Sequence, residues 1–480
     1  MQNLLIFTVS VVLARLISPQ TFGLFGMAVI FTGFALHIAT LGMEPAIAQR
    51  RNLTEGHLRS GMTLSVLMGL TITAALWLLA GPVAVFFHEP RVAPVLRVLS
   101  LIFVFSGLSS TSMGLLRRRL EFDLIFKAEL TAYLVGYTAV SITLAALGHG
   151  LLGLVAGTLV THAILCCLVL YFARPPLGFG WRWEDARELI GFGGGVSLTR
   201  FFGAAATRVD NIAIGRFLTA ADLGLYARAY NIMFLPLIRF TGIFSSVLLP
   251  VYAKMQDDRP RIADGYLKVL GASTLFVFPL MVGLMLSARY VVVGVYGPKW
   301  EGATLALRVL CAAGVFKIGS SMAASVVQAS GRVYLQVWRE GASLALLTAG
   351  ALAMVRYGLG GVGLAVVLAS FYLYAAMSRQ ALSLLGLTWR AFYLAQRPSL
   401  VIALIVGLAQ AVMILVLERT VGEGWMLLKL FLLLGASATV FLFSLLYLPA
   451  SIKGEVPAWI ARNYAPRLPR PLRGFILGRF

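Results

Sequence analysis

The sequence predicts an all-α integral membrane protein with about fourteen transmembrane helices. Hydrophobic residues occupy 59% of the 480 positions and charged residues only 12%, a balance that is too apolar for a soluble globular protein. The apolar residues form roughly fourteen runs, each close to the ~20 residues that a helix needs to cross a bilayer, and the joints between them are short. The net charge of +21 comes mainly from Lys and Arg at alternate joints. This is the positive-inside pattern of membrane proteins, so it does not indicate a nucleic acid partner.

The first half of the chain contains six predicted spans, and the charges at their joints alternate. The basic runs 49–51 and 117–119 follow the second and fourth spans, which places both joints on the cytoplasmic side. The first span is short and carries no basic leader, so we expect a truncated first helix. The six predicted spans cover residues 1–17, 22–41, 58–87, 92–116, 125–146 and 151–172.

The second half follows a basic cytoplasmic linker and has the same alternation of apolar spans and charged joints. Its six predicted spans are followed by two more apolar runs and by a basic tail. The tail mixes arginines with large apolar residues, so we expect it to lie in the cytoplasm as an interfacial anchor on anionic lipid. The eight predicted spans cover residues 190–217, 223–250, 262–296, 303–328, 334–355, 359–377, 399–417 and 425–448.

An internal repeat divides the chain into two lobes. The segment 15–25 aligns with 216–226, and the tetrapeptide at 96–99 recurs unchanged at 307–310. An even number of spans in each repeat predicts two six-helix bundles related by a pseudo-two-fold axis along the membrane normal, with a cavity between them. The predicted domains are an N-terminal lobe at 1–175, a cytoplasmic linker at 176–189, a C-terminal lobe at 190–385, two additional transmembrane helices at 386–449 and the basic cytoplasmic tail at 450–480.

Charged residues among apolar neighbours at 200–239 mark the predicted binding region. If 190–217 is one helix, Arg200, Arg208 and Asn211 share one polar face. A lipid-exposed arginine near the bilayer centre costs at least ~2.5–3.5 kcal/mol, so we expect these side chains to line a watery cavity that binds an anion. Arg216 and Arg228 lie nearer the membrane surface, where reaching for lipid headgroups is an equal alternative. The predicted substrate-binding residues are Arg200, Arg208, Asn211, Arg216, Arg228, Arg239 and Lys317.

Asp210 is one of few acidic residues inside a predicted span, and it has two interpretations. It is either a proton or sodium coupling site or the structural partner of Arg208 or of another arginine. No cluster with metal-ligand spacing, no Gly-rich phosphate loop and no catalytic constellation occurs in the sequence. We therefore expect neither an enzyme nor a cofactor nor a metal.

Several short segments carry a resemblance to a known family. They are LARL at 13–16, FGL at 22–24, AQR at 48–50, LLRRRL at 115–120, DN at 210–211 with IGR at 214–216, and LYARAY at 225–230. In these segments the chain resembles the polysaccharide transporter (Wzx-type flippase) branch of the multidrug/oligosaccharidyl-lipid/polysaccharide flippase superfamily. The resemblance implies fourteen helices, two six-helix lobes plus two further helices, and alternating access for an undecaprenyl-pyrophosphate-linked oligosaccharide.

Together these features predict an exporter of exopolysaccharide, capsule or O-antigen repeat units in the bacterial inner membrane, with both termini in the cytoplasm. Its predicted partners are the lipid-linked oligosaccharide, anionic lipid at the tail and other polysaccharide assembly proteins. One alternative is a multidrug or lipid II exporter of the same superfamily. A second is a membrane glycan polymerase or ligase, which would need larger outer loops than the short joints found here.

Overall fold

The computed structural model describes residues 2–50, 52–176, 178, 180–206, 208–254, 258–330 and 333–449, with the backbone alone at 2–4, 37, 192, 195–196, 198–206, 243–254, 333–334 and 423. All regular structure in these residues is helical. The chain divides into two compact units, Met1–Gly224 and Leu225–Phe480. The predicted all-α fold class is therefore confirmed, while the lobe boundaries and the bundle symmetry stay predictions.

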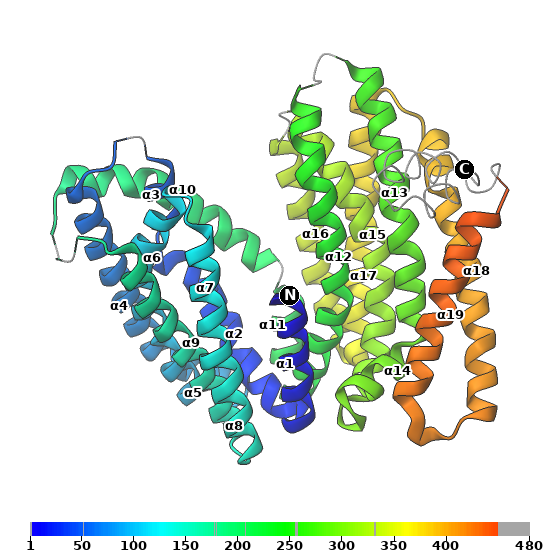
Figure 1. Cartoon of the computed structure of the whole chain (residues 1–480), viewed down its shortest axis with the longest axis horizontal. Coiled ribbons are helices and arrows are strands. Elements are labelled where there is room, and N and C mark those ends of the chain that lie inside the picture. The colour runs from blue at the N-terminus through cyan, green and yellow to red at the C-terminus, as the bar shows by residue number, and fades with distance from the viewer. Residues whose placement is uncertain are drawn as a thin grey trace. The chain divides into compact units, whose positions relative to one another are not determined.

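Unit 1 is a bundle in which α4, α6 and α9 pack side by side and α10 crosses α2, α3 and α4 (Figure 1). The helix ends follow local sequence signals. Ser18 precedes Pro19 and accepts a hydrogen bond from the Thr21 N–H (3.3 Å), and Thr54 and His57 form a capping box at the start of α4. The helices are α1 (Gln2–Leu16), α2 (Pro19–Ala39), α3 (Met43–Gln49), α4 (Glu55–Phe86), α5 (Val92–Ser100), α6 (Ile102–Arg118), α7 (Phe122–Ala132), the π-helix η1 (Tyr133–Val140), α8 (Ser141–Ala146), α9 (Gly150–Ala173), α10 (Trp183–Ala206) and α11 (Val209–Phe217).

In unit 1 a tight turn separates α2 from α3, and the predicted continuous span 190–217 is interrupted. Leu41 and Gly42 separate α2 from α3 with positive φ angles of 45° and 57°. A Cβ on Gly42 would lie 2.3 Å from the Gly193 carbonyl oxygen, so only glycine allows α10 to cross the chain so closely here. The prediction of one helix over 190–217 is wrong, because α10 ends at Ala206 and α11 begins at Val209. Arg208 lies in this interruption with non-helical backbone (φ −125°, ψ 1°), so the residues from 200 to 215 do not form one continuous polar face.

Unit 2 holds its longest helices side by side, with α15 against α17 and α13 against α18 (Figure 1). Large side chains fill its interior, and Trp300 and Tyr266 are almost fully buried. Its elements, starting with the helix that crosses the unit boundary, are α12 (Ala220–Lys254), α13 (Arg259–Leu286), α14 (Ala288–Val291), the π-helix η2 (Val292–Tyr296), η3 (Pro298–Trp300), α15 (Ala303–Ala329), α16 (Val333–Met354), η4 (Val355–Tyr357), α17 (Gly358–Leu385), α18 (Trp389–Thr420), η5 (Glu423–Trp425) and α19 (Met426–Tyr447).

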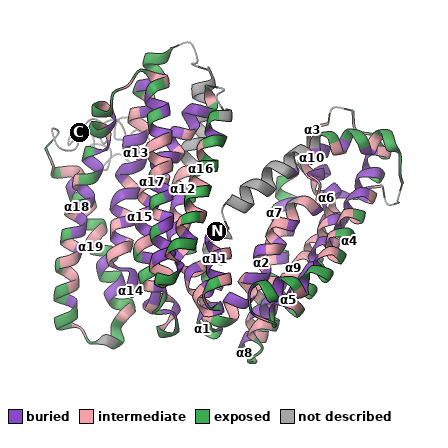
Figure 2. Ribbon diagram, turned by 180° about the vertical axis from the view of Figure 1, so that it is seen from behind, coloured by how far each residue is buried: buried purple, intermediate pink, exposed green. Residues whose placement is uncertain are grey.

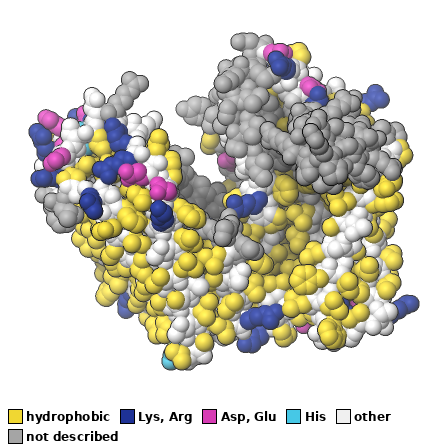
Figure 3. Space-filling view, in the orientation of Figure 1, with side chains coloured by type: hydrophobic (Ala, Val, Ile, Leu, Met, Phe, Trp, Pro, Cys, Tyr) yellow, Lys and Arg dark blue, Asp and Glu magenta, His cyan; other side chains and the backbone are white. Residues whose placement is uncertain are grey.

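The outer faces of both units are suited to a lipid environment. Ten helical stretches of the described chain are long and apolar enough to cross a membrane, and one of them, Leu335–Leu385, contains both α16 and α17. Exposed residues on α18 and α19 are mostly large and apolar, including Leu404 and Phe431 (Figure 2). Hydrophobic side chains dominate the middle of the described surface on the face seen in Figure 3, and most of the charged side chains visible there lie above and below them. Apolar surface of this extent is expected only where hydrocarbon is the solvent. The count of fourteen transmembrane helices stays a prediction.

Candidate functional site

Arg208 is held between α10 and α11 and lies against α2. A Cβ on Gly33 would lie 3.5 Å from the Arg208 Nη2 atom and 3.6 Å from its Cζ atom, so the guanidinium rests on the α2 backbone where a side chain is missing. The Arg208 side chain is half-buried, and it forms no ion pair or hydrogen bond with any described residue. Its positive charge is therefore retained within the helical unit without a described carboxylate to neutralise it.

Asp210 and Asn211 begin the next helix and interact with each other. Asp210 is only 3% exposed, and its Oδ1 atom accepts hydrogen bonds from the Asn211 backbone N–H (2.8 Å) and side-chain Nδ2 (3.1 Å). A carboxylate in the first turn of α11 is also stabilised by the helix dipole. The structure does not bring Arg208 and Asp210 into an ion pair. The role of Asp210 in ion coupling stays a prediction.

Arg216 anchors the end of α11 to the end of α4. Its Nη1 atom donates a hydrogen bond to the Phe86 carbonyl oxygen (2.7 Å) and lies 2.7 Å from Nδ1 of the His88 ring. The guanidinium also lies over the Phe86 ring, 5.3 Å from its centroid. A carbonyl in the last turn of a helix has no partner within that helix, so the arginine completes the end of α4.

Lys317 joins α15 to α12 through an aromatic partner. Its Nζ atom donates a hydrogen bond to the Tyr230 hydroxyl (3.0 Å) and lies 4.9 Å from the centroid of the same ring. Tyr230 belongs to a ladder along α12, with ring centroids 6.3 Å from Tyr226 and 5.5 Å from Phe234. Lys317 forms no ion pair in the part of the chain that the structure describes. A neutral tyrosine thus orients the ammonium group and leaves its charge in place.

The remaining predicted binding residues differ in their surroundings. Arg228 lies over two rings of unit 2, 5.8 Å from the Tyr296 centroid and 5.6 Å from the Trp300 centroid. Arg239 is exposed on α12. The Arg200 side chain lies outside the described residues. Within unit 1 the structure therefore brings together Asp210 and Asn211, and within unit 2 it supports Lys317 and Arg228 with aromatic rings.

Residues 12–305 match the protein family described as "Polysaccharide biosynthesis protein". The chain belongs to this polysaccharide biosynthesis family. The match covers most of the chain, including the predicted binding region at 200–239. The family assignment agrees with the resemblance to polysaccharide transporters found in the sequence.

The names of two relatives of the chain agree with this family. The chain is 28% identical over 326 residues to the lipopolysaccharide biosynthesis protein WzxC of Escherichia coli (strain K12), a match that covers 67% of this chain and 66% of WzxC. It is 25% identical over 337 residues to the teichuronic acid biosynthesis protein TuaB of Bacillus subtilis (strain 168), covering 68% of each chain. The matched part thus spans about two thirds of the length of these relatives.

The fold of the chain is similar to that of a solved structure. The lipid II flippase MurJ in an inward closed conformation matches it with a TM-score of 0.70 and 15% sequence identity, covering 92% of this chain and 95% of MurJ. At this identity the likeness concerns the fold alone. The family and the fold are those of transporters, in agreement with the prediction that the chain is not an enzyme.

Sequence reasoning missed a charged cluster that fixes α10 to the rest of unit 1. His57 Nε2 lies 3.1 Å from Asp185 Oδ1 and 3.3 Å from Glu188 Oε2, and Arg50 forms an ion pair with Glu188. The Thr54 N–H donates to His57 Nδ1 (3.3 Å), so the His57 Nε2 atom carries the proton that points at the acids. Arg50 and His57 also hold the pKa of the Glu188 carboxyl below its ordinary value. The only sequence signal was the density of both charge signs at two joints that lie more than a hundred residues apart.

Proposed function

We propose that this flippase moves an undecaprenyl-pyrophosphate-linked oligosaccharide across the bacterial inner membrane by alternating access. The transported glycan would be a repeat unit of an exopolysaccharide, a capsule or an O-antigen. The names of the relatives WzxC and TuaB, which refer to lipopolysaccharide and teichuronic acid biosynthesis, support this substrate class. The isoprenoid tail stays in lipid during transport, so the protein has to accommodate the diphosphate and the sugars.

The observation that carries the proposal is the state of Lys317. It sits in a helix of mostly apolar residues, is oriented by the Tyr230 hydroxyl and has no carboxylate partner in the described chain. A partly buried cation without a carboxylate is costly unless an anion binds it during the functional cycle. In unit 1, Arg208 is likewise a partly buried cation without a carboxylate partner in the described chain. A diphosphate or an acidic sugar supplies the missing negative charge.

The proposal gives the predicted residues different parts. Lys317 in unit 2 and Arg208 in unit 1 each bind an anionic group of the substrate, and Arg228 presents its guanidinium from its aromatic neighbours. Asn211, Arg200 and Arg239 are further substrate contacts, and Arg216 acts at the membrane surface. Asp210 changes protonation or binds sodium if transport is coupled to an ion gradient.

Arg208 provides the test that separates substrate binding from structural neutralisation. Arg208→Ala should abolish surface polysaccharide in a strain that lacks its own flippase while the protein stays in the membrane. Arg208→Lys should restore only part of the export, since lysine keeps the charge but loses the fork-shaped donors. The double variant Arg208→Ala with Asp210→Asn should still fail to export at normal abundance. Recovery of export in the double variant would show that Arg208 only neutralises Asp210.

The proposal also places both termini and the joint after α6 in the cytoplasm, with the basic tail on anionic lipid and other polysaccharide assembly proteins nearby. Lys127 is exposed near this joint, so a cysteine there reports its side. In a variant without Cys166, Cys167 and Cys311, Lys127→Cys should resist an impermeant thiol reagent in intact cells and react in inverted membrane vesicles. Labelling in intact cells would show that this joint lies outside the cytoplasm and would overturn the proposed orientation.

A further inference from the structure

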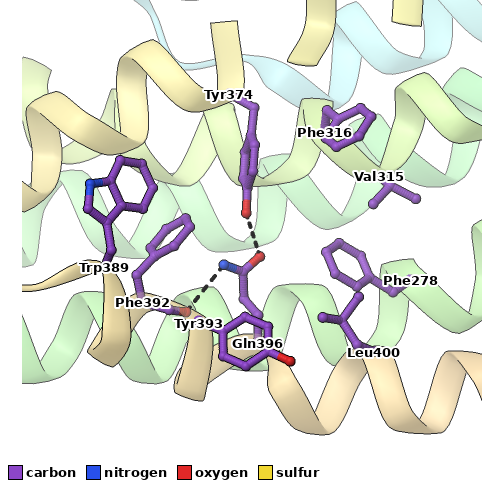
Figure 4. Close-up of a pocket in the computed structure, with 9 residues that line it drawn as sticks. All are labelled: Phe278, Val315, Phe316, Tyr374, Trp389, Phe392, Tyr393, Gln396 and Leu400. Carbon is purple, nitrogen blue, oxygen red and sulfur yellow. Dashed lines mark hydrogen bonds between the residues drawn. The ribbon is translucent and has the colours of Figure 1, made fainter. Parts of the chain in front are cut away.

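Four helices of unit 2 enclose an aromatic cavity of about 390 Å3 (Figure 4). Phe278 of α13 and Phe316 of α15 form part of its wall, Tyr374 projects from α17, and Trp389, Tyr393 and Leu400 come from α18. Figure 4 shows Trp389 at one end of the cavity and Phe278 with Leu400 at the other. The volume falls in the ~300–1,000 Å3 range of pockets that hold small organic ligands.

The polar groups inside this cavity are already satisfied by one another. Gln396 Oε1 accepts a hydrogen bond from the Tyr374 hydroxyl (2.9 Å), and Gln396 Nε2 donates to the Phe392 carbonyl oxygen (3.3 Å). A ligand that enters therefore meets aromatic and aliphatic surface, and a polar group would lose its hydration without a partner. The interior is suited to a hydrocarbon chain.

The mouth of the cavity lies on the first turns of α18, where aromatic side chains meet the surface. Trp389 is 52% exposed and Tyr393 is 57% exposed. The helix has 32 residues, a length of roughly 48 Å, whereas the hydrocarbon core of a bilayer is only ~30 Å thick. Its Trp- and Tyr-bearing start therefore belongs at the membrane–water interface, where these residues are enriched. A chain that enters here comes from the adjacent lipid leaflet.

Two arginines flank this mouth on the same helix. Arg390 and Arg397 stand three residues before and four residues after Tyr393, so the three side chains share one face of α18. Both arginines are exposed, and neither forms an ion pair or hydrogen bond with a described residue. Two cations beside an apolar pocket complement a ligand that has a negative headgroup and a hydrocarbon tail.

We infer that this cavity binds one anionic phospholipid of the leaflet around the start of α18. One acyl chain lies between Tyr374 and Leu400, and the phosphate lies against Arg390 and Arg397. The site is separate from the Lys317 region, because Val315 and Phe316, which line the cavity, point away from Lys317 by roughly 160° and 100° around α15. The bound lipid would fill the space among α13, α15, α17 and α18 and would stabilise the packing of α17 and α18 against α13 and α15. The inference does not depend on the transported substrate.

Native mass spectrometry of the full-length detergent-purified protein tests the site with dioleoyl phosphatidylglycerol as the probe. The wild type should retain one phosphatidylglycerol more tightly than dioleoyl phosphatidylcholine. Combining Arg390→Gln with Arg397→Gln should weaken that binding on the order of tenfold, since two headgroup contacts are lost. Leu400→Trp, which puts a larger side chain at the end of the cavity opposite Trp389, should weaken it similarly.

Matched controls keep the test specific to the pocket. Arg379→Gln removes an exposed arginine of α17, five residues beyond Tyr374 and on another face of that helix, and Leu404→Trp enlarges an exposed residue one turn beyond Leu400. Both controls should bind phosphatidylglycerol like the wild type, and each variant's thermal unfolding without added lipid checks its folding. Equal binding of the two phospholipids, or unchanged binding in both pocket variants, would overturn the inference. Preferential displacement of phosphatidylglycerol by undecaprenyl phosphate would also overturn it and would assign the cavity to an isoprenoid chain.

Discussion

Two groups of cations, one in each unit, have different surroundings. At the α3 end of unit 1, Arg50 is paired with Glu188 and Arg117 with Glu44. In unit 2, Lys317 lies against the ring and hydroxyl of Tyr230. A carboxylate cancels a positive charge, whereas an aromatic ring attracts the cation through its quadrupole and leaves the net charge unchanged. The difference indicates that cations paired with acids hold unit 1 together, and that a cation supported by aromatic rings remains ready for an anionic ligand.

Loss of the Lys317 charge should have the largest effect on transport. We expect Lys317→Ala to reduce export of surface polysaccharide by at least roughly 30-fold at unchanged abundance, because the substrate anion loses a desolvated cation. Lys317→Arg should retain a measurable part of the activity. Lys268, which pairs with Asp264 (2.7 Å) at the surface of α13, provides the control, and Lys268→Ala should leave export within twofold of the wild type. If Lys317→Ala and Lys268→Ala reduced export equally, a cation held by an aromatic ring would not differ in function from a cation paired with an acid.

Crowding of Arg208 should have the next largest effect. A leucine at Gly33 occupies the place where the Arg208 guanidinium now meets the α2 backbone, so we expect Gly33→Leu to lower export by roughly five- to tenfold. Gly33→Ala should be milder, because a Cβ alone stays at ordinary contact distance, 3.5 Å from Nη2. Gly81→Leu is a matched control, since a Cβ at Gly81 meets no atom within 4 Å. If Gly33→Leu exports normally, the position of Arg208 against α2 is unimportant for transport.

A change at His57 should affect stability more than transport. His57→Ala removes the imidazole that lies 3.1 Å from Asp185 Oδ1, and the Asp185 side chain is only 13% exposed, so we expect a loss of about 1–3 kcal/mol in the free energy of unfolding. Thermal unfolding of the purified protein measures the effect. Glu55→Ala breaks the exposed i,i+4 pair with Arg59 and should change stability by less than ~1 kcal/mol. A large loss of export without a loss of stability in His57→Ala would show that the cluster acts in transport and not in folding.

Protonation of Glu188 should give the smallest effect, and its sign follows from the pKa. Arg50 and His57 lower the pKa of this carboxyl from its ordinary value of 4.5, so the ionised form is favoured in the folded protein. The stabilisation is fully present above pH 4.5 and is lost as the pH falls through the lowered pKa. The difference in melting temperature between the wild type and Glu188→Gln should therefore shrink between pH 6 and pH 3. A difference that grows on acidification would contradict the assigned pairing.

Most of the fold was predictable because hydrocarbon imposes a simple pattern on a membrane chain. The apolar runs located α4, α9 and α15 to within a few residues, since every span has to satisfy its backbone within a helix. Pairings between distant residues were not predictable in this way. His57 and Asp185 meet only because α10 folds back over α4, and hydropathy contains no information on that crossing.

The side-chain contacts of the candidate site could not be predicted from the sequence either. Arg208 and Asp210 are neighbours in the sequence, which suggested an ion pair. Arg208 precedes α11 with non-helical backbone and lies against Gly33, whereas Asp210 belongs to the first turn of α11 and accepts hydrogen bonds from Asn211, so proximity along the chain did not bring the two side chains together. The Lys317 partner was missed for another reason. Tyr230 looked like an ordinary apolar position of α12, and only the structure shows its hydroxyl directed at the lysine (3.0 Å).

The interruption between α10 and α11 makes Arg208 part of a joint. The helices on both sides are stiff, so a change in direction is concentrated in the few backbone torsions around this residue. Rotation about those torsions would also swing the guanidinium away from Gly33. A change in the backbone torsions of Arg208 therefore moves α11 and the charge at the same time. Binding of an anion at the guanidinium would in this way be coupled to the position of α11.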